Sequence, residues 1–237
     1  MQSYSEFLDL SVGFPQEGYS VIDDELYFQD LNLMEMIETY GTPLRFTYLP
    51  MISKKIQQAI LLFQTAIIKN NYRGDYKYCY CTKSSHFRHI VEEALKNGIH
   101  LETSSAFDMP MIEALEKKGA LTKDITVICN GFKTYQYKQY IIDMLHDGYK
   151  NIIPVLDNKE EFNLYDDEIE MDTPCNLGIR IAAEEQPDSQ FYTSRLGVRM
   201  EDVIDFYNNK IAGNPNFRVK LLHFFINSGI TDSPYYW

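Results

Sequence analysis

The sequence ITVICNGFKTYQYKQYIIDMLHDGYKNIIPVLD, residues 125–157, contains one complete strand–helix–strand unit. The apolar runs 125–131 and 151–157 predict two buried strands, and residues 134–148 between them predict a helix that ends at Gly148. Strands joined through such a crossover are parallel, and the connection is right-handed. The unit therefore predicts an α/β protein built around a parallel sheet.

The same alternation extends on both sides of this unit, and from residue 76 onward we expect six strands. A closed (β/α) barrel has eight strands in about 250 residues. An open doubly wound sheet that binds a nucleotide is disfavoured, because no GxGxxG or GxxxxGK[ST] motif follows the first strand. Either the sheet is not a barrel, or the chain is part of a longer protein. The other expected strands are 43–49, 76–83, 99–105, 176–184 and 217–229, and the other expected helices are 52–70, 87–98, 109–119, 159–168 and 200–213.

The first 41 residues differ in composition from the rest of the chain. They mix Gly, Pro and acidic residues, and they end in the helix-like run LNLMEMIETYG, which Gly41 closes. Pro43 then opens the regular alternation of strands and helices. We therefore predict an N-terminal segment of residues 1–41 and a strand–helix domain of residues 42–237.

Composition limits the classes of function. A hydrophobic content of 45% predicts a sizeable core, and 22 Lys+Arg against 34 Asp+Glu give a net charge of −12, which disfavours binding to nucleic acid or to a membrane surface. No run approaches 18 apolar residues, and the N-terminus lacks the pattern of a signal peptide. We expect a soluble, cytoplasmic protein. The cysteines form no CxxC pair and are expected to be reduced thiols that bind no metal: Cys79, Cys81, Cys129 and Cys175.

Polar residues lie at the carboxyl ends of the expected strands, where both architectures bind their ligands. Lys83 closes an aromatic strand. Burial there would lower the pKa of its amine and make it a nucleophile able to form a Schiff base. Alternatively, the side chain reaches out to water. The residues at these strand ends are Lys83, Glu102, Ser104, Ser105, Asn130, Asp157, Arg180, His223, Asn227 and Ser228.

Each of the other candidates also has two interpretations. Glu102 and Arg180 could position a cofactor or form a structural ion pair. Phe225 shares a strand face with His223, so its ring could stack on a flat cofactor or belong to the core. Ser228, followed by a glycine, could bind a phosphate group or form only a turn.

Six segments, taken in order, resemble the alanine-racemase-like, fold-type III family of pyridoxal-phosphate-dependent decarboxylases. Within that family, the biosynthetic arginine decarboxylases are most similar. The family has Tyr-Ala-Val-Lys-Ala-Asn where this chain has residues 80–85. The most subfamily-specific match is at residues 128–133, where the arginine decarboxylases have Ile-Cys-Asn-Gly-Tyr-Lys and this chain has ICNGFK. The six segments are YCTKSS (80–85), LETSS (101–105), ICNGFK (128–133), GIRI (178–181), SRLG (194–197) and LLHFFINSG (221–229).

The resemblance implies a parallel (β/α) barrel of the TIM type that binds pyridoxal 5'-phosphate, with about six of its eight strands in this chain. It implies that Lys83 holds the cofactor as a Schiff base, and that Glu102, Arg180, Phe225 and Ser228 bind the cofactor without a metal. It also implies a homodimer or a higher homo-oligomer. Residues 1–41 would associate with a C-terminal β-domain that these 237 residues lack, so the chain alone is expected to be inactive.

The function implied is decarboxylation of a basic amino acid, L-arginine to agmatine and CO₂, in polyamine biosynthesis. Two departures leave alternatives open. Phe225 stands where the family has a histidine that stacks on the pyridine ring, and Asn227 replaces a glycine. A phenyl ring can stack but can donate no proton. The alternatives are a non-catalytic relative that acts as a partner or regulatory subunit, and a pyridoxal-phosphate homeostasis protein.

Overall fold

The computed structural model describes residues 17–166, 169, 174–182 and 196–225. The chain forms two compact units, Met1–Tyr48 and Leu49–Trp237. Among the described residues, no helix combines the length and the apolar character that crossing a bilayer requires. The four cysteines are free, and two of them, Cys129 and Cys175, are buried.

The first unit contains a three-stranded antiparallel sheet that the sequence analysis did not predict. Asp23 and Asp24 have φ angles of 50° and 64° and form the turn of its first hairpin. Asn32 caps the helix that follows, because its side chain accepts hydrogen bonds from the backbone N–H groups of Met34 and Glu35. The elements of this unit are β1 (Tyr19–Ile22), β2 (Glu25–Phe28), β3 (Leu31–Asn32) and α2 (Leu33–Tyr40).

The predicted strand 43–49 is wrong. Residues 43–48 are in neither helix nor strand, and helix α3 (Leu49–Lys69) begins directly after them. Phe46 and Tyr48 instead pack edge-on against Phe28 of β2, with ring centroids 5.8 and 5.5 Å apart. The aromatic residues that suggested a strand therefore cover the small sheet of the first unit.

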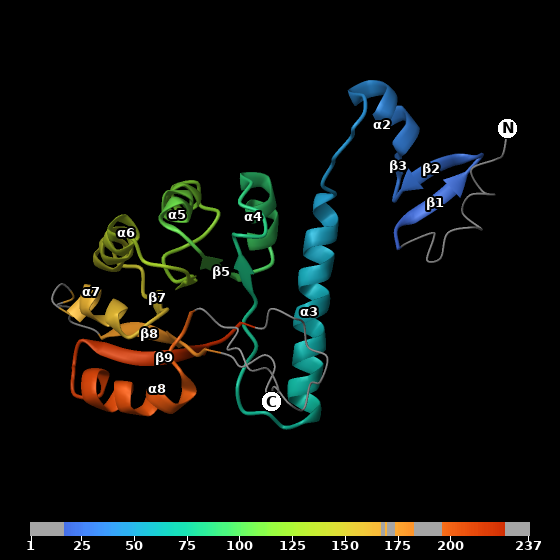
Figure 1. The fold of residues 1–237 in the computed structure, drawn as a ribbon. Helices are drawn as coiled ribbons and strands as arrows, with labels where there is room; N and C mark the ends of the chain where they lie inside the picture. Colours follow the sequence, from blue (N-terminus) through green and yellow to red (C-terminus); the bar gives the residue numbers. More distant parts are fainter. Residues whose placement is uncertain (1–16, 167–168, 170–173, 183–195, 226–237) are drawn as a thin grey trace, which may run out of the picture. The chain divides into compact units, whose positions relative to one another are not determined.

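The second unit is built on a six-stranded parallel sheet whose strands lie side by side in chain order (Figure 1). A doubly wound sheet reverses its strand order, so sequential order is that of a barrel. Among the described residues, the first and last strands do not pair with each other, which makes the sheet a partial barrel and confirms the predicted fold class. The strands are β4 (Cys79–Cys81), β5 (His100–Thr103), β6 (Thr126–Cys129), β7 (Asn151–Leu156), β8 (Cys175–Arg180) and β9 (Phe217–His223).

The predicted helices of this unit are all present, and Figure 1 shows α4, α5, α6 and α8 following one another around the outside of the sheet. The predicted helices 159–168 and 200–213 each consist of two shorter pieces, and the second of these ends in a π-helical turn, η3. Besides α3, the bounds are α4 (Arg88–Leu95), η1 (Ala106–Asp108), α5 (Met109–Lys117), α6 (Tyr135–His146), η2 (Glu160–Phe162), α7 (Asn163–Asp166), α8 (Met200–Phe206) and η3 (Tyr207–Ile211).

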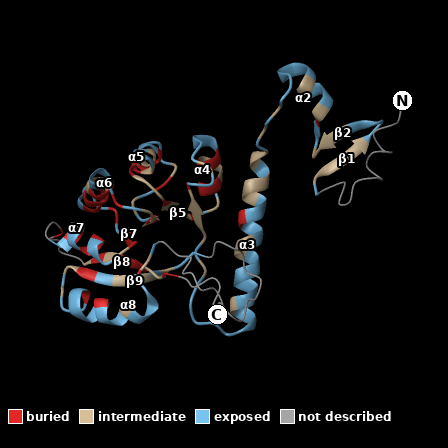
Figure 2. Cartoon of the chain, viewed as in Figure 1, coloured by how far each residue is buried: buried red, intermediate tan, exposed pale blue. Residues whose placement is uncertain are grey.

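The core lies between the sheet and these helices (Figure 2). Leu101, Val127 and Ile152 come from neighbouring strands and are fully buried, as are Ile112 of α5 and Ile141 of α6. Each such side chain stabilises the fold by about 1.5–3 kcal/mol. Helix α3 contributes much less, since only its Ile56 is buried, in a separate small cluster with Ala94 and Ile99.

The outer edge of β9 has no partner strand among the described residues. Its exposed Leu222, with 56% of the residue surface accessible, adds an apolar side chain to that strand. Phe224 and Phe225, directly after the strand, are also exposed. This end of the sheet therefore combines unpaired backbone groups with apolar surface.

A buried ion pair ties together the turns that follow β6 and β7. The Lys133 ammonium lies 3.5 Å from the Glu161 carboxylate, and the two side chains are 0% and 4% exposed. The same ammonium donates to the carbonyl oxygens of Gly131 and Val155. The Glu161 carboxylate accepts from the backbone N–H groups of Lys133 and Asp157, at 3.3 and 3.0 Å. Burial lowers the pKa of Lys133, and the charges of Glu161 and Asp157 oppose that shift.

Substituting Lys133→Met should lower the free energy of unfolding by about 3–5 kcal/mol, because it leaves the Glu161 carboxylate buried without its cation. The matched control is Lys150→Met, which removes an ion pair with Asp124 whose side chains are 72% and 71% exposed. That pair should contribute less than about 1 kcal/mol. Urea denaturation of both variants measures the difference, and equal losses would contradict the buried network.

Gly131 should tolerate alanine much less well than Gly119 does. Both have a left-handed φ, +83° and +73°, so each pays about 1–2 kcal/mol for an added Cβ. Only at Gly131 would that Cβ also meet backbone, 2.5 Å from the Ser104 carbonyl oxygen, while nothing lies within 4 Å at Gly119. We expect Gly131→Ala to be about 1–3 kcal/mol less stable than Gly119→Ala in urea denaturation. Equal stabilities would contradict the close approach of this turn to β5.

Candidate functional site

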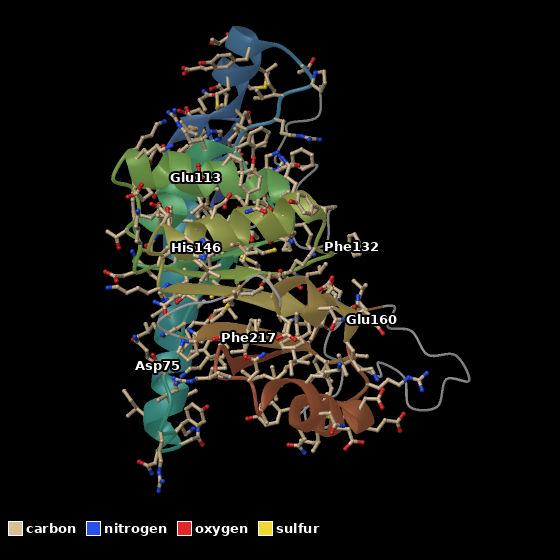
Figure 3. All side chains as sticks on the ribbon, turned by 90° about the vertical axis from the view of Figure 1, so that its left-hand side faces the viewer. Asp75, Glu113, Phe132, His146, Glu160 and Phe217 are labelled. Carbon is tan, nitrogen blue, oxygen red and sulfur yellow. The ribbon has the colours of Figure 1, made fainter. Side chains whose placement is uncertain are left out.

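The carboxyl ends of the six parallel strands lie on one side of the second unit. Figure 3 shows Phe132 and Glu160, which follow β6 and β7, on the right, and His146, which ends α6, on the left. Five polar side chains from five successive strand ends come together on the carboxyl side. They are Glu102, Asn130, Asp157, Arg180 and His223, all of which the sequence placed at strand ends.

Three of these side chains form a hydrogen-bonded chain across the sheet. The amide nitrogen of Asn130 donates to a Glu102 carboxylate oxygen at 3.1 Å, and the same nitrogen lies 3.4 Å from His223 Nε2. Glu102 belongs to β5 and His223 to β9, so the chain joins strands that are far apart in the order of the sheet. These contacts show that the curved sheet turns the three side chains toward one another.

Arg180 pairs with Asp157 rather than with Glu102. The guanidinium lies 3.4 Å from the Asp157 carboxylate, whose side chain is fully buried. The expected alternative, a structural ion pair between Glu102 and Arg180, is therefore wrong. Asp157 follows β7 and Arg180 ends β8, so the partner comes from the neighbouring strand, whereas Glu102 lies three strands away. Pairing with Asp157 leaves the Glu102 carboxylate to the Asn130 amide.

Lys83 and Phe225, which follow the first and the last strand of the sheet, lie close to each other. The Lys83 ammonium lies 5.5 Å from the centre of the Phe225 ring, which is cation–π range. Lys83 is exposed, so the expectation that burial activates its amine is wrong, and the alternative of a side chain that reaches out to water describes it. Phe225 is 48% exposed and does not belong to the core. An accessible amine and an accessible aromatic face therefore lie side by side.

Three buried polar atoms of this group have no hydrogen-bond partner among the described residues. They are the acceptors Asn130 Oδ1 and Asp157 Oδ2, and the ring nitrogen His223 Nδ1. Buried polar groups in folded proteins are almost always paired, and each exception raises the question of a bound partner. Their gathering at the carboxyl end of the sheet, where Lys83 follows the first strand, makes this the candidate ligand site.

The remaining predicted residues divide into two groups. The backbone N–H groups of Ser104 and Ser105 donate to the Asp108 carboxylate, so these two serines form the start of η1. Among the described residues, no hydrogen bond joins either serine to the site. Ser228 and Asn227 lie outside the described residues, so the predicted phosphate-binding role of Ser228 stays a prediction.

Sequence reasoning missed Lys133, Glu161 and Cys81 as neighbours of this site. The Cys81 thiol lies 4.0 Å from the Glu102 carboxylate. The Glu161 carboxylate accepts a hydrogen bond from the backbone N–H of Asp157 and forms an ion pair with Lys133. Glu161 and Lys133 therefore fix the backbone position of Asp157. A lysine in the apolar run ICNGFK was a signal for Lys133, but Glu161 stands in an acidic stretch typical of a solvated surface.

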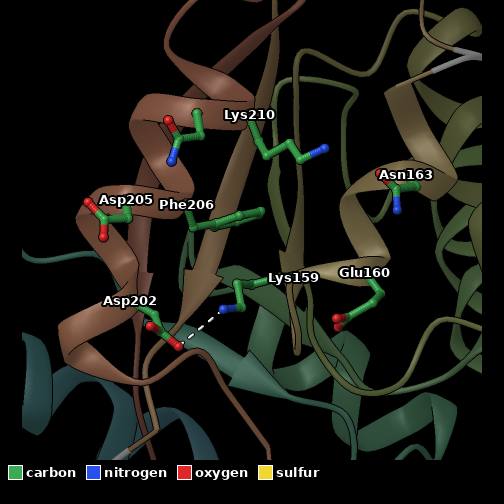
Figure 4. Close-up of a pocket in the computed structure, with 8 residues that line it drawn as sticks. Lys159, Glu160, Asn163, Asp202, Asp205, Phe206 and Lys210 are labelled. Atoms are coloured by element: carbon green, nitrogen blue, oxygen red, sulfur yellow. Dashed lines mark hydrogen bonds and ion pairs between the residues drawn. The ribbon is translucent and has the colours of Figure 1, made fainter.

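A separate cavity of about 300 Å³ lies on the outside of the barrel, between η2 and α8 (Figure 4). Lys159 pairs with Asp202 at its rim, at 3.1 Å. Its lining combines charges of both signs with the ring of Phe206 and shares no residue with the strand-end site. The candidate site therefore rests on the strand ends and not on this cavity.

No family model matches the chain. Among curated proteins, biosynthetic arginine decarboxylase 2 of Synechocystis sp. is 23% identical over 223 residues, which are 85% of this chain and 34% of the relative. The chain thus spans about a third of the length of the curated relative.

Two solved structures of amino-acid decarboxylases have the same fold as this chain. Diaminopimelate decarboxylase from M. jannaschii, in complex with L-lysine, superposes with a TM-score of 0.73 at 19% identity, over 92% of this chain and 50% of that one. SrLDC, in complex with PLP and cadaverine, gives a TM-score of 0.56 at 15% identity, over 81% and 43%. The predicted resemblance is confirmed: the chain is similar in sequence to biosynthetic arginine decarboxylases and has the fold of these decarboxylase structures.

Proposed function

We propose that this chain is the barrel portion of a pyridoxal-phosphate-dependent decarboxylase that acts on a basic amino acid. The observation that carries the proposal is the accessible Lys83 amine, 5.5 Å from the Phe225 ring, in a sheet whose strand ends carry three buried polar atoms with no partner among the described residues. The likeness to arginine decarboxylases points to the conversion of L-arginine to agmatine and CO₂.

The residues at the strand ends fit the cofactor. An aldehyde cofactor needs an accessible amine, a face for its flat ring and polar groups for its substituents. Lys83 would hold the cofactor through its accessible amine. Phe225 supplies an aromatic face. Glu102 and Arg180 supply charged groups, and Ser228 completes the proposed set as a phosphate ligand.

When bound, the cofactor supplies an electron sink for the charge left behind by CO₂. The contributions of the chain are positional and electrostatic. Glu161 holds the backbone of Asp157, and the Asp157 carboxylate orients the Arg180 guanidinium. Asn130 holds the Glu102 carboxylate toward the interior of the site. The polar groups therefore stand in fixed positions before any ligand enters, which is what electrostatic stabilisation requires.

The charge of the chain suits a cationic substrate. With 34 acidic and 22 basic residues, its net charge of −12 attracts the guanidinium of arginine. Within this proposal, residues 1–41 associate with a β-domain outside this sequence. The active protein is a homodimer or larger homo-oligomer that works in the cytoplasm on polyamine biosynthesis.

The absence of a stacking histidine favours one alternative. Phe225 can donate neither a proton nor a hydrogen bond from its ring, which suits a non-catalytic relative that binds a partner subunit. A homeostasis protein would bind the cofactor and release no CO₂. A non-catalytic subunit would bind no cofactor, so cofactor binding and CO₂ release together separate the three functions.

Substituting Lys83→Ala should abolish covalent attachment of the cofactor. The protein saturated with pyridoxal phosphate is reduced with borohydride, digested and analysed by mass spectrometry, which should locate the pyridoxyl group on Lys83. The visible absorbance band should disappear in the variant. Lys77→Ala is the matched control, since Lys77 lies just before β4 in the same segment. Label at another lysine, or a visible band retained in Lys83→Ala, would refute the role of Lys83.

The substrate is tested with the full-length protein, which includes the proposed β-domain, by CO₂ release from L-arginine, L-ornithine, L-lysine and diaminopimelate at equal concentrations. We expect arginine to be preferred in kcat/KM by about 10-fold or more, which corresponds to roughly 1.4 kcal/mol of transition-state discrimination. A preference for another of these amino acids would contradict arginine as the substrate but would leave the proposed decarboxylase function in place. No release from any of them, by a protein that carries the cofactor on Lys83, would favour the homeostasis protein.

A further inference from the structure

We infer that Glu102 and Asn130 fix the His223 imidazole with its proton on Nδ1, and that this N–H is a hydrogen-bond donor of the ligand site. The inference deepens the proposed function, since it assigns to His223 the donor that the phenyl ring of Phe225 lacks. The ligand group that it would bind is an anionic oxygen, carried either by the cofactor or by the carboxylate of the amino acid.

The Glu102 carboxylate determines the orientation of the Asn130 amide. An ionised carboxylate can only accept hydrogen bonds, so the amide atom 3.1 Å from it must be the NH₂ nitrogen. The amide oxygen, Asn130 Oδ1, then points elsewhere, which agrees with its lack of a partner among the described residues. The ambiguity between oxygen and nitrogen that an amide usually carries is thereby removed.

The Asn130 amide in turn determines the tautomer of His223. The nitrogen that donates to Glu102 also lies 3.4 Å from His223 Nε2, in a long hydrogen bond. An amide NH₂ group has two protons and no acceptor capacity, so Nε2 must be the acceptor. In a neutral imidazole with an accepting Nε2, the proton is on Nδ1.

The imidazole is neutral in its surroundings. Burial lowers the pKa of His223, and the charges of Arg180 and Lys133 act in the same direction, while Glu102 and Asp157 oppose them. A buried ring with a lowered pKa carries one proton at pH 7, and the contact with Asn130 assigns that proton.

The Nδ1–H group is a buried donor with no partner among the described residues. The nearby unpaired atoms Asn130 Oδ1 and Asp157 Oδ2 are acceptors of the same buried cluster, and none of them satisfies it. A donor held in a fixed direction by two positioning residues is preorganised for a ligand acceptor. His223 is thus a ligand-binding residue, and Asn130 and Glu102 are its positioning residues.

The tautomer is tested first, on the ligand-free chain. Long-range ¹H–¹⁵N correlation spectra at pH 7 distinguish a protonated ring nitrogen from an unprotonated one, and the spectrum of His223→Asn identifies the signals of His223 among the five histidines. We expect a protonated Nδ1 and an unprotonated Nε2. Asn130→Asp, which replaces the donor with an acceptor, should move the proton to Nε2. A wild-type imidazole protonated on Nε2, or on both nitrogens, would overturn the inference, and this measurement does not depend on the proposed function.

The donor role is tested with two substitutions that keep different ends of the imidazole. The amide nitrogen of His223→Asn can stand near the position of Nδ1, whereas the amide of His223→Gln reaches the position of Nε2. We expect His223→Gln to weaken ligand binding by about 10- to 100-fold, the range for one hydrogen bond to a charged group, and His223→Asn to weaken it less. Circular dichroism confirms that both variants are folded.

The probes, each added separately, are pyridoxal phosphate, L-arginine and inorganic phosphate. Comparing them distinguishes an oxygen of the cofactor from the carboxylate of the amino acid as the group that His223 binds. The probe that shifts the His223 Nδ1 signal in wild type identifies the group bound. Equal affinities of wild type and His223→Gln for every probe would refute the donor role. Absence of cofactor binding in wild type would refute the proposed function, while the tautomer measurement still decides the positioning of His223.

Discussion

All six strands of the second unit run in the same direction and in chain order, and the rest of the structure depends on this constraint. Because parallel strands end at the same edge, residues that are up to 121 positions apart in sequence, from Glu102 to His223, gather in one site. The curvature of the sheet then brings the segment after the first strand to the segment after the last, where Lys83 meets Phe225. The polar groups are held in place by the fold itself.

Much of this fold could be predicted from the sequence, because long apolar runs that alternate with helical periods leave few architectures. The six strands from residue 76 onward and the helices between them were all predicted, although the observed strands are shorter. The errors lie where a pattern is short or has two uses. The hairpin of β1 and β2 has strands of four residues each, too short for a clear period. The run 43–49 has strand-like residues, but Phe46 and Tyr48 pack on Phe28 instead of pairing in a sheet.

The position of the site could be predicted from the sequence, but the hydrogen-bond and ion-pair partners within it could not. The strand ends in the sequence identified the five site residues Glu102, Asn130, Asp157, Arg180 and His223. The sequence does not show whether Arg180 pairs with Glu102 or with Asp157. Arg180 pairs with Asp157 because β7 and β8 are neighbours, which is a fact of sheet order. Likewise, the burial of Lys133 and Glu161 follows from two turns that pack together, and Lys83 is exposed because its segment lies at the rim.

In the part of the chain that the structure describes, the outer edge of β9 pairs with no strand, and this has a consequence for how the chain behaves in solution. The amide and carbonyl groups that point away from the sheet along that edge, with the exposed Leu222 beside them, offer a template on which a strand of another molecule can add. Electrostatic repulsion between molecules of net charge −12 opposes that addition, and dissolved salt screens the repulsion. Colloidal stability of the chain should therefore be greatest in dilute buffers of low ionic strength and should decline as electrolyte is added.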